Sequence, residues 1–177
     1  MKKTDFAPRL PLRQVAAIGL AAGLCAVLQA AAGVLPGIGH VLSMLPTFPI
    51  ALLTMASPGA GAACLAVAAA TVFTVFPEES PILVFMTGPL GIALGLAGSL
   101  NVSVVAQSCI GAVTLTLGMA ALSLIVGIDP LGGGLASLGL LRTLGVHLVF
   151  SFVYSLLWIT ALKRTAPRLL RLLNRLS

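Results

Sequence analysis

The chain has 177 residues, of which 59% are hydrophobic and only 8% are charged, and its mean hydropathy is +1.14. These values exclude a water-soluble globular domain. The formal net charge of +6 would suit nucleic acid in a soluble protein. Here the cations flank the first and last apolar segments without interleaved aromatic residues, so we expect anionic membrane lipid as a partner and no nucleic acid.

Charge is concentrated at the two ends of the chain. The stretch from 14 to 162 carries only four charges: Glu78, Glu79, Asp129 and Arg142. Because a bilayer core about 30 Å thick takes roughly 20 apolar residues of helix, this stretch holds six spans with short loops. The positive-inside rule places the basic head (1–14) and the basic tail (163–177) in the cytoplasm. We therefore predict an all-α integral membrane protein, a single six-helix domain over residues 1–177, multi-pass in the bacterial inner membrane.

The apolar segments predict spans at about 15–35, 39–55, 61–76, 82–100, 104–128 and 138–162. Pro46 and Pro49 lie inside the second span. Proline removes a backbone donor and disfavours helix before its ring, so we expect this span to be kinked or broken. In a bilayer such a break is tolerated only where protein or a water-filled cavity covers the freed carbonyls. Alternation from a cytoplasmic start places the loops that hold Glu78, Glu79 and Asp129 outside.

A secretory signal is the alternative reading of the first span. Lys2, Lys3 and the apolar run 15–28 imitate its basic and apolar regions, and Ala30 to Ala32 imitate its cleavage site. Cleavage would leave five spans. The apolar run continues to Leu35 without a polar break, which favours an uncleaved first helix.

The tail has helical periodicity. Its arginines recur at i, i+4, i+7 and i+11, at Arg164, Arg168, Arg171 and Arg175. Leucines cover the remaining positions, so we predict a basic amphipathic helix. An interfacial anchor on anionic lipid is favoured over a docking surface for a protein partner.

Motifs for catalysis are lacking in this sequence. It contains no P-loop, no HExxH, no GxSxG elbow and no Cys/His ligand set. Neighbouring Glu78 and Glu79 point apart in a proline-bounded loop and are more often simply solvated. We therefore expect no enzyme, no cofactor and no metal site, and no means of powering transport within the chain itself.

Polar residues near the outer ends of the spans are the candidates for binding a solute. Arg142 lies about one turn inside the sixth span, where it either snorkels to headgroups or faces a pocket and meets an acid or a solute carboxylate. His147 begins a stripe with Ser151, Tyr154 and Trp158 that lines a cavity or belongs to the packing and the interfacial belt. The expected solute-binding residues are Arg142, Asp129, Glu78, Glu79, His147 and His40.

Rows of small residues give a packing signal. The first span carries two rows at four-residue spacing, Ala17, Ala21, Cys25 and Ala22, Ala26, Ala30, and the fourth carries Gly88, Gly91, Gly95 and Gly98. Such rows allow close approach of helices, either within the bundle or to a partner helix. The first span has more small residues than one neighbour needs, which leaves a face for a partner.

The stretches LPGIGHVLSMLPTFPIALLTM and FMTGPLGIALGLAG, together with the alanine rows of the first span, resemble the substrate-binding S components of energy-coupling factor (ECF) transporters. The resemblance implies a subunit that captures a vitamin or another small micronutrient from outside and topples to release it. It implies a coupling transmembrane protein and two cytoplasmic ATPases as partners. The coupling contact would map onto Ala17, Ala21, Ala22, Ala26 and Ala30. The alternative is a small integral scaffold of envelope assembly that transports nothing.

Overall fold

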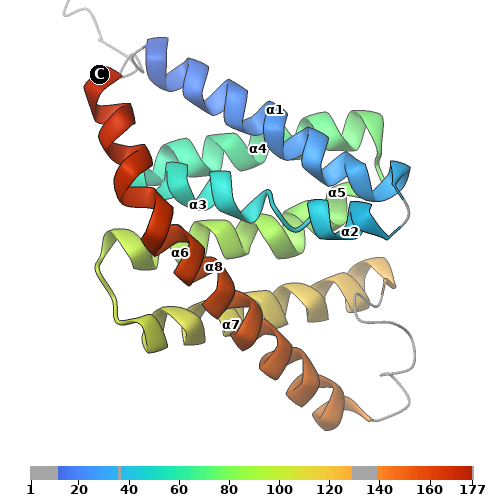
Figure 1. Cartoon of the computed structure of the whole chain (residues 1–177). Helices are drawn as coiled ribbons and strands as arrows, with labels where there is room; N and C mark the ends of the chain where they lie inside the picture. Colours follow the sequence, from blue (N-terminus) through green and yellow to red (C-terminus); the bar gives the residue numbers. More distant parts are fainter. Residues whose placement is uncertain (1–11, 36, 129–138, 177) are drawn as a thin grey trace, which may run out of the picture.

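The computed structural model describes residues 12–35, 37–128 and 139–176, with the side chains of 140 and 170–176 left aside. Every regular element in these ranges is a helix (Figure 1). The elements are α1 Leu12–Val34, α2 Ile38–Leu42, α3 Thr47–Ala56, α4 Pro58–Val75, α5 Ser80–Ile82, η1 Leu83–Thr87, α6 Gly88–Ser99, α7 Val104–Ala121, η2 Leu122–Val126 and α8 Leu140–Leu176.

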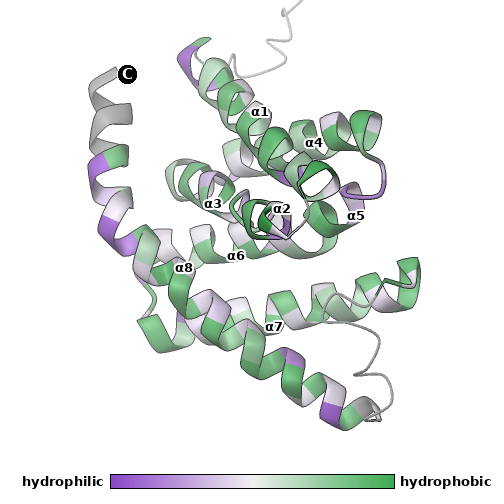
Figure 2. Ribbon diagram, turned by 45° about the vertical axis from the view of Figure 1, so that its right-hand side comes forward, coloured by the Kyte–Doolittle hydropathy of each residue, from purple (hydrophilic) through white to green (hydrophobic). Residues whose placement is uncertain are grey.

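Six stretches of these helices are long and apolar enough to cross a membrane: Leu12–Val34, Ile38–Ala56, Pro58–Val75, Ser80–Ser99, Val104–Val126 and Leu141–Leu169. The predicted number of spans is confirmed. Large apolar side chains such as Leu20, Val105 and Val149 are exposed, where lipid would meet them. Hydrophobic positions recur along all the long helices (Figure 2). The start of α1 and the end of α8 lie at the same end of the bundle (Figure 1).

The second span is broken, as its prolines predict. α2 ends at Leu42, α3 begins at Thr47, and residues 43–46 form turns between them, which we call the break segment. The Ser43 hydroxyl donates to the His40 carbonyl at 2.9 Å, and the Cys25 thiol lies 3.7 Å from the Pro46 carbonyl. Neighbouring side chains thus satisfy carbonyls that the break releases.

A π-helical turn, η1, interrupts the fourth span directly before Pro89. Proline has no N–H, so the Phe85 carbonyl four residues earlier cannot form its α-helical hydrogen bond. The Gly88 N–H instead reaches back five residues to the Leu83 carbonyl. The Phe85 carbonyl lies against Gly118 of α7, where a Cβ atom would collide with it. Gly118 therefore allows α7 to approach the irregular turn.

The glycine row of the fourth span packs inside the bundle. A Cβ atom at Gly91 would lie 2.9 Å from the Thr47 carbonyl oxygen, and one at Gly95 would lie 2.6 Å from the Ala51 carbonyl oxygen. Both distances are too short for a side chain, so these glycines set the close contact of α6 with α3.

The buried apolar residues form two clusters. One joins α1, α3 and α4 and includes Ala22, Cys25 and Cys64. The other joins α3, α6, α7 and α8 and includes Leu94, Met119 and Ile159. Because α3 contributes to both, it fixes the two parts of the bundle to each other.

The C-terminal part of α8 extends beyond the last span. Its helical backbone continues to Leu176 with Pro167 inside it, and Arg164 and Arg168 are exposed. The side chains of Arg171 and Arg175 lie outside the described part of the structure. The basic amphipathic face and the cytoplasmic position of both ends therefore stay predictions.

Candidate functional site

A cavity of about 270 Å³ lies beside the break segment, and we call it the Tyr154 cavity. It is enclosed by α2, the break segment, α5 and η1, the C-terminal part of α7 with η2, and α8. Its lining residues are His40, Ser43, Met44, Ile82, Met86, Thr87, Leu115, Leu122, Ile128, Phe150 and Tyr154. The cavity thus occupies the region where three helices depart from α-helical geometry. Departures of this kind recur at functional sites.

A few polar groups interrupt an otherwise apolar lining. The Tyr154 hydroxyl donates to the Met44 carbonyl at 3.2 Å and so ties α8 to the break segment. The Thr87 hydroxyl is buried, with 4% of the residue exposed, and finds no hydrogen-bond partner among the described residues. His40 is exposed and lines the same cavity. An unsatisfied buried hydroxyl is costly unless a bound molecule satisfies it.

Aromatic packing holds Tyr154 in place. Its ring stacks on Phe150 with 5.8 Å between centroids and meets Trp158 edge-on at 6.1 Å. Trp158 in turn contacts Phe48 of α3, with centroids 6.2 Å apart. The hydroxyl of Tyr154 is therefore presented from a fixed ring, which suits recognition of a small molecule.

Among the described residues, the lining has no carboxylate, lysine or arginine. The cavity therefore suits a small solute with an apolar body and one or two hydrogen-bonding groups rather than a strongly charged one. Five of the six residues expected from the sequence to bind a solute are described by the structure, and of these five only His40 lines the cavity.

The two glutamates at positions 78 and 79 have different environments. Glu78 is exposed, whereas Glu79 is 8% exposed and accepts a hydrogen bond from Gln29 Nε2 at 3.2 Å. This contact joins the end of α1 to the segment before α5 and gives Glu79 a structural role. Arg142 is exposed on α8, and neither it nor the glutamates line the Tyr154 cavity. Asp129 lies outside the described residues.

The residues of the predicted polar stripe on the sixth span contact different neighbours along α8. His147, Ser151 and Ser155 are buried, and the Thr116 hydroxyl of α7 donates to the Ser151 hydroxyl at 3.2 Å. Both ring nitrogens of His147 lack a partner among the described residues. Tyr154 and Trp158 instead face α3 and the break segment. Of the four stripe residues, Tyr154 lines the Tyr154 cavity, whereas His147, Ser151 and Trp158 do not.

The alanines expected to contact a partner lie on the packed side of α1. Ala22 is 1% exposed and Ala26 7%, and both belong to the buried cluster with α4. Ala17, Ala21 and Ala30 are half-buried. The exposed side carries Gly19 and Gly23 instead, where an added Cβ would meet nothing within 4 Å. The contact of these alanines with a partner stays a prediction.

Sequence reasoning missed Ser43, Thr87 and Phe150, and it named Tyr154 as one member of the polar stripe. The prolines offered a signal, because Pro46 and Pro89 mark the two irregular backbone segments that border it. Within the described ranges, no three His, Cys, Asp or Glu side chains gather in a way that could hold a metal ion.

The six apolar helices define the class, a multi-pass membrane protein with a small apolar cavity next to a broken span. No protein-family model matches the chain, and neither the curated proteins nor the solved structures give a match.

Proposed function

We propose that the protein is the membrane-embedded solute-binding subunit of an ATP-driven importer of the ECF type, located in the bacterial inner membrane. The Tyr154 cavity is the observation that carries this proposal. It combines an apolar lining, a buried Thr87 hydroxyl that no described residue satisfies, and a fixed phenol at Tyr154. These features support capture of a vitamin-sized or smaller solute.

The energy for uptake would come from partners. The sequence has no nucleotide-binding loop, so a coupling transmembrane protein and two cytoplasmic ATPases would supply ATP hydrolysis. We place the coupling contact on the exposed side of α1 around Gly19 and Gly23, because small residues permit close helix approach. Half-buried Ala17, Ala21 and Ala30 would border this contact.

The test is co-purification from native membranes followed by mass spectrometry of both proteins and small molecules. A bound solute together with ATPase subunits is the expected result. Purified protein that carries no solute and never recruits an ATPase would overturn the proposal and favour an envelope scaffold that transports nothing.

Thr87→Val examines the cavity directly. The substitution keeps the side-chain shape and removes the unpartnered hydroxyl, so the folded protein should be as stable as the wild type or more stable. Affinity for the co-purified solute should fall about tenfold, as expected when one hydrogen bond is lost. Thr160→Val on the exposed side of α8 is the matched control, and equal affinities for all three proteins would contradict this assignment of the site.

A further inference from the structure

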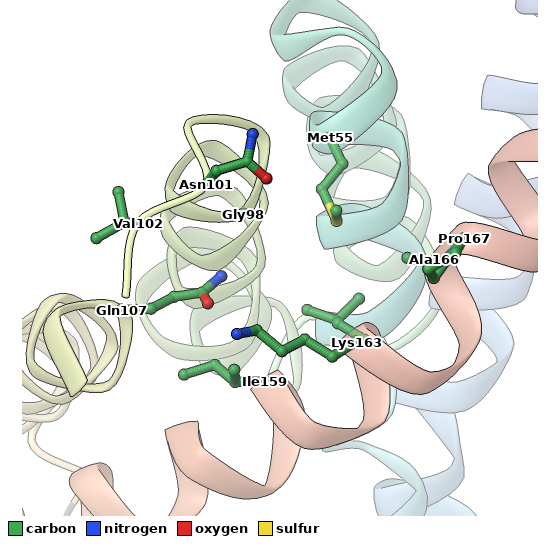
Figure 3. Close-up of a pocket in the computed structure, with 10 residues that line it drawn as sticks. Met55, Gly98, Asn101, Val102, Gln107, Ile159, Lys163, Ala166 and Pro167 are labelled. Carbon is green, nitrogen blue, oxygen red and sulfur yellow. The ribbon is translucent and has the colours of Figure 1, made fainter. Parts of the chain in front are cut away.

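A second cavity, of about 260 Å³, lies at the end of the bundle where α1 begins, and we call it the Lys163 cavity (Figure 3). The end of α3, the turn between α6 and α7, the start of α7 and the late part of α8 enclose it. Met55, Ile159 and Leu162 form apolar walls. The side chains of Lys163, Gln107 and Asn101 supply its polar groups.

Gln107 offers a buried acceptor to this cavity. The residue is 3% exposed, and its Nε2 donates to the Leu94 carbonyl at 3.1 Å. That bond fixes which end of the amide is oxygen, and Oε1 has no hydrogen-bond partner in the described part of the chain. A buried acceptor without a donor calls for a ligand that carries an O–H or N–H group.

Lys163 offers a cation to the same cavity. Its ammonium points toward Gln107 across the opening (Figure 3). The described carboxylates belong to Glu78 and Glu79, which lie between the end of α4 and the start of α5 and do not line this cavity. Arg164 and Arg168 are exposed on the next turns of α8. The surroundings are therefore positive, which favours an anionic ligand over a zwitterionic one.

Asn101 brings an amide to the mouth of the cavity. Its φ of 53° places it in the left-handed region, within the turn in which its N–H donates to the Gly98 carbonyl at 3.2 Å. Asparagine is one of the few residues that tolerate this conformation. Glycine tolerates it equally well, so the amide can be removed without altering the backbone.

We propose that the Lys163 cavity binds a phosphate ester whose alcohol part carries a hydroxyl group, the chemistry of the phosphatidylglycerol headgroup. The phosphate accepts from the Lys163 ammonium and the Asn101 amide, and the glycerol hydroxyl donates to Gln107 Oε1. The cavity lies at the end of the spans, where headgroups reside, and its apolar walls suit the ester region of a lipid.

Native mass spectrometry of the full-length protein in detergent tests this site. We expect wild-type protein to retain phosphatidylglycerol and Lys163→Gln to bind it about tenfold more weakly, the loss of one charge-assisted hydrogen bond. Arg164→Gln removes the same charge one residue away and should change binding less than about twofold. Lys163→Arg should restore binding, because it returns the cation.

Asn101→Gly is the second variant, and a threefold loss of affinity at unchanged melting temperature is expected.

sn-Glycerol 1-phosphate, titrated in a parallel arm, identifies the source of the ligand. Tighter binding of the lipid supports a headgroup site, and equal binding of the soluble ester supports the same chemistry with a soluble ligand. If neither probe distinguishes Lys163→Gln from Arg164→Gln, the proposal is overturned.

Discussion

The two ends of the bundle differ in how their backbones are built. At the end that holds the Tyr154 cavity, the second span is broken and two π-helical turns interrupt the fourth and fifth spans. At the end that holds the Lys163 cavity, the helices are regular up to their termini, and cations border the opening. Irregular backbone at membrane depth needs cover from protein or a cavity. Prolines therefore indicate the Tyr154 cavity in the sequence, whereas exposed cations indicate the Lys163 cavity.

If the irregular end depends on close helix contact, Gly118→Ala should have the largest effect. The added methyl group meets the Phe85 carbonyl of η1, and overpacking of this kind costs about 3 kcal/mol. Gly59→Ala at the other end would place its methyl group in ordinary contact with Ser57 Oγ, 3.9 Å away, and should leave stability unchanged. Thermal unfolding in detergent measures both variants, and equal melting temperatures would remove the contrast between the ends.

The adjacent glutamates provide the next comparison. Glu79→Ala leaves the Gln29 amide without its buried acceptor and should cost about 2 kcal/mol. Glu78→Ala changes an exposed side chain and should alter stability by less than about 0.5 kcal/mol. Unfolding of the two variants under the same conditions measures their stabilities. A larger loss of stability for Glu78→Ala than for Glu79→Ala would reverse the assigned roles.

Of the three substitutions expected to destabilise the protein, Tyr154→Phe should have the smallest effect. The variant keeps the aromatic packing and loses only the hydrogen bond to the Met44 carbonyl, worth about 1 kcal/mol. Hydrogen exchange should quicken in the break segment and stay unchanged at the start of α7. Uniform exchange along the chain would show that this hydroxyl does not hold the break.

Membrane thickness and proline chemistry made most of the fold predictable. A span needs roughly 20 apolar residues, which sets the number of helices, and Pro46 with Pro49 indicates the break. The π-helical turn before Pro89 was missed, because a lost donor there permits several local geometries. The geometry that this turn adopts depends on its contact with Gly118 of α7, which is distant in the sequence.

The candidate site was less predictable than the fold. Charge drew attention to Arg142, Glu78 and Glu79, whereas the described residues that line the Tyr154 cavity include no carboxylate, lysine or arginine. Thr87 looks ordinary in sequence, since most membrane threonines bond their own helix. Only the arrangement of neighbouring helices shows that its hydroxyl has no hydrogen-bond partner in the described part of the chain.

Helix α8 lines both cavities, with Tyr154 facing one and Lys163 the other. The stretch from Phe150 to Lys163 contains no proline and measures about 20 Å at 1.5 Å per residue. Pro167 lies beyond it. We expect such a segment to tilt as a rigid helix. A change in its tilt, as when the bilayer thins or thickens, would then alter the shapes of both cavities together.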